Sequence, residues 1–180
     1  MTYDPKLDGV DHINIYSQGK TELGRMLSNF YRHPFEFTCG DYNHLGAFHS
    51  IEGLWYWIQL YNPTLSPDSE HNRRVNVLRG LWGSHAKEKG RELRRTLIGY
   101  APEPMHERDF RHVIGAAMVE KVATNDMIAR LMHESTLPFT HYYVYNGKIV
   151  ETDSEWILKE WERMRSLIKK LLKDGELECD

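Results

Sequence analysis

The sequence predicts a mainly α protein of the α+β class, folded as one domain over residues 1–180, and three observations lead to this expectation. Apolar residues recur every three or four positions in several long stretches, as they do on one face of a helix. The alternation of apolar and polar residues that is typical of strands is confined to short segments. A length of 180 residues with 41% hydrophobic content suits one buried core without disulfides or structural metal.

The first half of the chain predicts two short strands and one long buried helix. Residues 12–16 alternate apolar and polar side chains, which predicts a half-buried strand, and residues 34–38 repeat this pattern. Glycine, aspartate and asparagine between positions 40 and 43 predict a turn. Ser50 is a good N-cap for the nearly all-apolar run that follows it, so we expect a helix that ends before Asn62-Pro63.

The second half predicts helices and one hairpin. A polar loop over 64–72 is followed by expected helices at about 73–80 and 84–98, separated by Gly83, and by a helix over 107–133 that breaks near residues 124–126, where Asn125 can cap its second piece. Asn146-Gly147 lies between two β-prone runs and predicts a type I′ hairpin over about 140–150. Asp153 or Ser154 then caps an amphipathic C-terminal helix over 154–174.

Charge and hydropathy exclude several classes of protein. Acidic residues outnumber basic ones, 26 to 23, and the formal net charge of −3 argues against a protein that coats nucleic-acid phosphates. The chain has no run of about 18 apolar residues and no signal-peptide pattern at its N-terminus. Cys39 and Cys179 are isolated thiols, as in a reducing compartment. We therefore expect no membrane partner and a cytoplasmic location, the host cytoplasm if the protein is viral.

The common metal, nucleotide and hydrolase motifs are absent from the sequence. The ten histidines show no HExxH or other ligand spacing, and no Gly-rich phosphate loop or GxSxG element occurs, so we expect no metal and no cofactor. Basic residues on the C-terminal helix have two interpretations: a solvated face paired with Glu160 and Glu162, or a patch that contacts phosphate.

Two acidic positions remain as candidates for chemistry. Glu52 lies in the first turn of the apolar helix, where it is either a favourable helix-dipole charge or a desolvated acid with a raised pKa. Asp153 follows the hairpin, between Glu151 and Glu155, and either caps the last helix or serves in a site. Carboxylates beside tryptophans suit the cleavage of a glycosidic bond, whose transition state is cation-like.

The tryptophans divide by position. Trp55, Trp57 and Trp156 fall near these acids, and we expect them to line a pocket that stacks a base. Trp82 and Trp161 are expected in the core.

A series of short motifs runs in order from about residue 12 to residue 156. They are Ile13-Asn14-Ile15-Tyr16; Leu27-Ser28-Asn29-Phe30 with Pro34-Phe35; Ser50-Ile51-Glu52; Ala86-Lys87 with Gly90-Arg91; Ala117-Met118 with Lys121; and Ile149-Val150-Glu151 with Asp153 and Trp156. Each motif is weakly specific, but the ordered set resembles the NADAR family, also called YbiA-like.

This resemblance implies a YbiA-like helical fold and an N-glycosidase that acts on ADP-ribosyl or ribosyl-phosphate compounds. Described members hydrolyse riboflavin-pathway intermediates or remove ADP-ribose from guanine in nucleic acid, so the implied partner is a small nucleotide or ADP-ribosylated nucleic acid. The implied catalytic residues are Glu52, Asp153 and Lys121. The implied ligand-binding residues are Asn29, Phe30, Gly90, Arg91 and Trp156, to which the tryptophan pattern adds Trp55.

Three positions depart from the family pattern. The lysine expected seven residues after Glu52 is Gln59, an amide that is neither nucleophile nor charge. The aromatic after Lys121 is Val122, and the glycine after Trp156 is Ile157. With these departures, the sequence resembles a divergent phage-type subgroup of the family. Two hypotheses therefore remain as alternatives to the enzyme hypothesis. One is a phage protein that binds a nucleotide or host protein without turnover, and the other is an interaction module that docks through its C-terminal helix.

Overall fold

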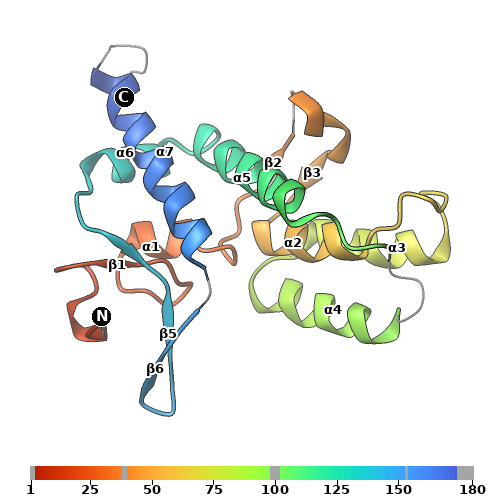
Figure 1. Cartoon of the computed structure of the whole chain (residues 1–180), viewed down its shortest axis with the longest axis horizontal. Helices are drawn as coiled ribbons and strands as arrows, with labels where there is room; N and C mark the ends of the chain where they lie inside the picture. The colour runs from red at the N-terminus through yellow and green to blue at the C-terminus, as the bar shows by residue number, and fades with distance from the viewer. Residues whose placement is uncertain (1–2, 38–39, 98–101, 153, 174–180) are drawn as a thin grey trace. The chain divides into compact units, whose positions relative to one another are not determined.

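The computed structural model describes residues 3–37, 40–97, 102–152 and 154–173, and the protein is mainly α with a few short strands (Figure 1). It comprises two compact units, one from residues 1–28 with 122–180 and one from residues 29–121. The expectation of a single domain over 1–180 stays a prediction. Among the described residues, no helix combines the length and the apolar composition needed to cross a membrane.

The first unit combines both ends of the chain. Its elements are a 3-10 turn Pro5–Leu7, β1 (Ile13–Asn14), α1 (Glu22–Leu27), α6 (Asp126–Glu134), β4 (Phe139–Thr140), β5 (Tyr142–Tyr145), β6 (Lys148–Glu151) and α7 (Glu155–Lys173). Strands β1 and β4, far apart in sequence, pair in parallel, and β5 and β6 form an antiparallel hairpin.

The second unit packs its helices around α2. Its elements are β2 (Phe35–Glu36), a 3-10 stretch Gly40–Leu45, β3 (Ala47–Phe48), α2 (Ile51–Leu60), α3 (Glu70–Asn76), a 3-10 turn Val77–Gly80, α4 (Gly83–Thr96) and α5 (Glu107–Ala123), of which the last two residues are assigned to the first unit. Strands β2 and β3 pair antiparallel. Helix α2 contacts α3, α4 and β3, so it is the centre of this unit.

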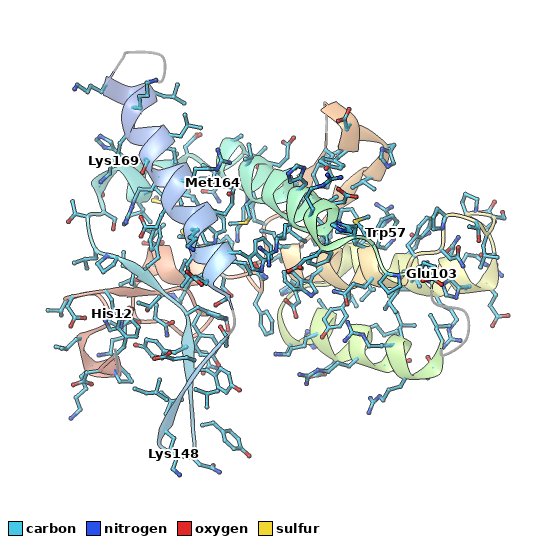
Figure 2. All side chains as sticks on the ribbon, viewed as in Figure 1. His12, Trp57, Glu103, Lys148, Met164 and Lys169 are labelled. Carbon is cyan, nitrogen blue, oxygen red and sulfur yellow. The ribbon has the colours of Figure 1, made fainter. Side chains whose placement is uncertain are left out.

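Several local expectations are confirmed. Ser50 caps α2 by accepting a hydrogen bond from the Gly53 amide at 3.0 Å, and Asn125 caps α6. Asn146 and Gly147 both have positive φ, 49° and 72°, as the type I′ hairpin turn requires. Helix α7, on which Figure 2 labels Met164 and Lys169, spans most of the predicted range and buries Trp161.

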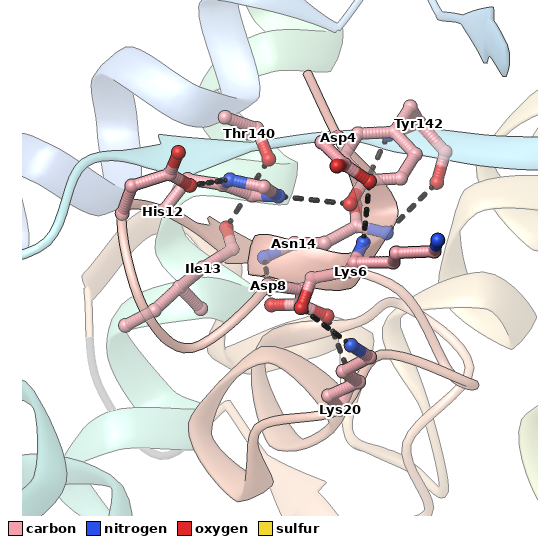
Figure 3. Close-up of polar contacts among 10 residues, drawn as sticks. Asp4, Lys6, Asp8, His12, Ile13, Asn14, Lys20, Thr140 and Tyr142 are labelled. Atoms are coloured by element: carbon pink, nitrogen blue, oxygen red, sulfur yellow. Dashed lines mark hydrogen bonds and ion pairs between the residues drawn. The ribbon is translucent and has the colours of Figure 1, made fainter.

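The predicted half-buried strand over 12–16 is wrong in its exposure. Residues 12–15 are all buried, and only Ile13–Asn14 pair as a strand. The polar side chains are tolerated because they are hydrogen-bonded (Figure 3): His12 Nε2 pairs with the Tyr142 hydroxyl at 2.8 Å, and the Asn14 side-chain amide donates to the Tyr142 carbonyl at 3.1 Å. Asp8, also buried, accepts from the Asn14 backbone amide at 3.0 Å.

The structure adds one helix, corrects one helix boundary and adds a strand. Helix α1 occupies a stretch where no helix was expected, and Thr21 caps it. Helix α3 begins at Glu70, inside the predicted loop, because the Ser69 hydroxyl accepts from the Asn72 amide at 3.2 Å. Both helices are short, so capping marks them better than apolar periodicity does. Strand β3 was not predicted; it exists through its pairing with β2.

Candidate functional site

The candidate site of the second unit is organised by the segment 29–31. The Asn29 carbonyl accepts a hydrogen bond from the Glu52 amide at 3.0 Å, which joins the segment to the first turn of α2. The Phe30 carbonyl accepts from the Gly83 amide at 3.1 Å, at the start of α4, and the Lys87 ammonium lies 5.4 Å from the Phe30 ring centroid. The segment therefore brings the N-terminal ends of α2 and α4 together.

Glu52 is a buried acid. Its side chain is 8% exposed, and burial raises the pKa of its carboxyl from 4.5 to about 7. The positive charges of Lys87 and Arg91 pull this pKa down, but they do not offset desolvation. Of the two interpretations of Glu52, these values favour the desolvated acid. A carboxyl that titrates near pH 7 can both accept and donate a proton at neutral pH.

Lys121, near the end of α5, is the second strongly perturbed group of this unit. It is 1% exposed, and burial lowers the pKa of its ammonium from 10.5 to about 7. Its Nζ lies 5.3 Å from the centroid of the Tyr31 ring. Burial lowers the pKa of His33, and the charge of Lys121 lowers it further. The segment 29–31 therefore accepts a hydrogen bond from the backbone amide of Glu52 and places the Tyr31 ring beside the Lys121 ammonium.

One face of α4 carries a row of cations toward α2. Lys87, Arg91 and Arg94 recur at helical spacing, and the first two act electrostatically on Glu52. Arg94 continues the row beyond the acid: its guanidinium carbon lies 5.2 Å from the Tyr56 ring centroid. Because positions four and three residues apart share a helix face, the row forms one continuous positive strip beside α2.

The close approach of α4 to α2 depends on Gly90. A Cβ atom at this position would lie 2.1 Å from Cγ of Tyr56, well inside van der Waals contact. Gly90 is buried, and its packing role explains why a glycine stands between Lys87 and Arg91 in α4. Its expected role in ligand binding stays a prediction.

Gln59, which replaces the lysine expected from the resemblance, is held in the structure by two hydrogen bonds. Its side-chain amide donates to the Trp55 carbonyl at 3.1 Å, and its carbonyl oxygen accepts from the Arg94 guanidinium. A lysine at position 59 would offer Arg94 no acceptor and would add a like charge beside it. The substitution therefore fits the row of cations on α4.

Of the two α2 tryptophans expected in a base-stacking pocket, one is placed differently from the expectation. Trp55 is half-buried on the same helix face as Glu52, and its ring meets the Phe110 ring edge-on at 4.7 Å. Trp57 is 6% exposed and belongs to the core, stacked on Tyr61 at 4.3 Å, so its expected place in a base-stacking pocket is wrong. Trp57 lies five residues after Glu52 on α2, and this spacing places the two side chains on different faces of the helix.

The two tryptophans expected in the core also divide. Trp82 is 38% exposed, so its expected place in the core is wrong. It is the N-cap residue of α4, and Arg32 and His49 lie against its ring. Trp161, on α7, is fully buried, as expected.

The expected site residues lie partly in one unit and partly in the other. Trp156 is half-buried on α7 in the first unit, and Asp153 lies outside the described residues. The second unit holds Asn29, Phe30, Glu52, Trp55, Gly90, Arg91 and Lys121.

Sequence reasoning did not single out Lys87 or Tyr31 as site residues. The available signal for Lys87 was its spacing of four from Arg91 on a helix, which places both cations on one face. For Tyr31 no local signal exists, since its contact with Lys121 is made across the fold.

The basic residues of α7 are largely paired along the helix. Lys159 bridges Glu155 at 2.7 Å and Arg163 bridges Glu160 at 2.5 Å, which favours the solvated face over a phosphate patch. Across the described parts of the chain, no group of three histidine, cysteine or acidic residues could hold a metal ion.

No model of a known protein family matches the chain, and neither a curated protein nor a solved structure does. The resemblance to the NADAR family rests on the ordered motifs, and the geometry around Glu52 is an independent observation.

Proposed function

We propose that this chain is a divergent NADAR-type N-glycosidase that hydrolyses the N-glycosidic bond of an ADP-ribosyl or ribosyl-phosphate compound. ADP-ribosylated guanine and ribosylated riboflavin-pathway intermediates are the substrate classes that the resemblance implies. The observation that carries the proposal is the buried Glu52, whose pKa is raised to about 7 beside the cations Lys87 and Arg91. An acid of this kind is suited to proton transfer at neutral pH.

In the proposed reaction, ionised Glu52 acts as a general base. It accepts a proton from water as the water oxygen bonds to the anomeric carbon. The carbon–nitrogen bond breaks, and its electron pair leaves with the nucleobase of the substrate. The proton held by Glu52 then passes to the departing nitrogen, which restores the carboxylate. The negative charge of Glu52 also stabilises the cation-like ribosyl group in the transition state.

The cations of α4 are suited to bind the anionic part of the substrate. Arg91 is exposed, and its guanidinium can bind two oxygens of a phosphate at once. Lys87, half-buried above the Phe30 ring, adds a second positive charge near Glu52. A phosphate bound by these cations would hold the attached ribose close to the acid.

Lys121 is the second catalytic candidate. Its pKa of about 7 means that a large fraction of the side chain is a neutral amine at physiological pH. A neutral amine can attack an anomeric carbon or accept a proton, whereas an ordinary lysine is almost fully protonated. Lys121 is therefore the candidate for the lysine chemistry that Gln59 does not provide.

A turnover assay with a matched control tests the enzyme hypothesis. ADP-ribosylated guanine and ribosylated pyrimidine intermediates are incubated with wild type, Glu52→Gln and Glu88→Gln, and the released base is measured by HPLC. Glu88 is an exposed acid on α4, so its variant controls for loss of charge. We expect Glu52→Gln to lose about 100-fold or more in rate, the usual contribution of a general base. Equal turnover by wild type and Glu52→Gln would remove Glu52 from the mechanism.

A nucleotide-binding protein without turnover is the second candidate, and the hydrogen-bonded Gln59 favours it. The residue that replaces the expected lysine is engaged by Arg94 and Trp55 and has no nucleophilic group. Calorimetry with ADP-ribose, run beside the HPLC assay, separates the two functions. Binding without product from either substrate class would support the second candidate and contradict the first.

A further inference from the structure

Trp82 is an exposed aromatic side chain with a cation on its ring. Its indole is 38% exposed, although indoles bury a large apolar area in most folds. The guanidinium carbon of Arg32 lies 4.6 Å from the Trp82 ring centroid, and the His49 ring is tilted against it at 6.4 Å. Arg32 is itself exposed, so this pair presents one aromatic plane and several hydrogen-bond donors to solvent.

The backbone on both sides of Trp82 is fixed to the site of Glu52. The preceding residue, Leu81, accepts a hydrogen bond from the hydroxyl of Ser50, the N-cap of α2, at 2.9 Å. The following residue, Gly83, donates to Phe30, and its positive φ of 60° turns the chain from Trp82 into α4. Trp82 is therefore held beside the first turn of α2, which carries Glu52.

We infer that Trp82 and Arg32 form the base-binding platform of the site, on which the substrate's planar base stacks beside the acid. This inference rests on the proposed function and deepens it by naming the residues that recognise the base. The exposed part of the indole offers the stacking surface. The Arg32 guanidinium, already ordered by the indole, offers a fork of donors to the edge of the base.

The chemistry of the pair indicates which bases it suits. A guanidinium pairs best with two adjacent acceptors, such as O6 and N7 of guanine, whereas adenine offers an acceptor and a donor there. Hydrogen bonds to those acceptors also stabilise the electron pair that the base carries away when the glycosidic bond breaks. The platform therefore favours a base with two adjacent acceptors over one without them.

Calorimetric binding of two probes tests this inference without requiring turnover. Guanosine 5′-monophosphate carries base, ribose and phosphate, whereas ribose 5-phosphate lacks the base. Both are titrated into wild type, Trp82→Ala, Trp82→Phe and the control Val77→Ala, which removes an exposed apolar side chain elsewhere in the unit. Thermal melting of each variant shows that it is folded.

We expect Trp82→Ala to bind guanosine 5′-monophosphate at least about fivefold more weakly, the loss of one base–aromatic stack. Trp82→Phe and Val77→Ala should stay within about twofold of wild type, and ribose 5-phosphate affinity should not change in any variant. Unchanged nucleotide affinity in Trp82→Ala would overturn the platform and leave the proposed function standing. Wild type that binds neither probe would overturn both.

Discussion

At the scale of single residues, the site depends on the balance between desolvation and charge at Glu52. Burial raises the pKa of this carboxyl, and the positive charges of Lys87 and Arg91 on α4 lower it by a smaller amount. This balance leaves the side chain titrating near pH 7. A surface glutamate with a pKa near 4.5 would be a poor proton donor at neutral pH.

The contribution of Lys87 to this balance can be measured directly. Removing a nearby positive charge favours the neutral carboxyl, so we expect Lys87→Gln to raise the pKa of Glu52 above about 7. The change is followed by the carbon-13 chemical shift of the Glu52 carboxyl during a pH titration. If Glu52 is the general base, the pH midpoint of kcat/KM moves upward with it.

Lys89→Gln is the matched control for this titration. Lys89 lies on the same helix, but its ammonium pairs with Glu92 at 2.8 Å and does not act on Glu52. We expect no change in the Glu52 titration. A pKa that moves equally in both variants would mean that overall charge, rather than the specific neighbour, sets it.

At the scale of elements, the packing of α4 on α2 holds the row of cations beside the acid. Gly90 permits this packing, since the Tyr56 ring occupies the space of a side chain. The helices could not carry Lys87 and Arg91 to Glu52 if a larger residue separated them.

We therefore expect Gly90→Ala to destabilise the protein. Alanine is the better helix former by up to about 1 kcal/mol, but overpacking against the Tyr56 ring costs about 1–3 kcal/mol or more, so the clash decides the sign. Urea unfolding measures the difference. Gly80→Ala is the control, because among the described residues beyond its own chain neighbours no atom lies within 4 Å of its added Cβ. In a Tyr56→Ala background the cost of Gly90→Ala should nearly vanish; a persistent cost would place the clash elsewhere.

In the first unit, the hydrogen bond between His12 and Tyr142 joins β1 to the start of β5. His12 is 1% exposed, so Tyr142→Phe leaves a buried ring nitrogen without this partner. We expect a loss of about 1–3 kcal/mol in the free energy of unfolding, seen as a lower urea midpoint at unchanged m value. Tyr145→Phe, at the exposed end of the hairpin, should change stability little. Equal midpoints for the two variants would show that the buried hydrogen bond contributes nothing.

At the scale of the whole molecule, Glu52 and Lys121 make stability depend on pH in opposite directions. Glu52 has a pKa of about 7 when folded and 4.5 as its ordinary value, so its burial costs stability increasingly as the pH rises from 4.5 to 7. Lys121 has a pKa of about 7 when folded and 10.5 ordinarily, so its cost is full below pH 7 and disappears as the pH rises toward 10.5. The two costs are largest together near pH 7.

The double variant Glu52→Gln/Lys121→Met tests this pattern. It removes both titrating groups, so we expect it to be more stable than wild type near pH 7 by several kcal/mol, with a smaller gain at pH 4 and at pH 10. Urea unfolding at the three pH values measures the gain. Glu88→Gln/Arg95→Gln, two exposed changes on α4, is the control and should show no maximum. A gain that does not peak near pH 7 would contradict the assigned pKa values.

The sequence predicted the helices and the hairpin better than it predicted the site. Helix α2 with its Ser50 cap, the Asn146-Gly147 turn and most of α7 follow from residues within a few positions of each other. Helix α3 starts earlier than predicted because a cap, rather than periodicity, determines its first turn. The family resemblance pointed to Glu52 and included Lys87 in a motif, but it gave Lys87 no role, because the proximity of Lys87 to Glu52 depends on the packing of α4 on α2.

The sequence by itself determined the mainly α class, because periodicity, capping and turn residues act locally along the chain, and it offered Glu52 as a candidate acid. Only the tertiary structure decided that Glu52 and Lys121 titrate near pH 7, that Trp57 is core and that Trp82 is exposed. Exposure and pKa depend on which distant segments cover a side chain and which charges they bring, and the segment 29–31 gathers those neighbours from three helices.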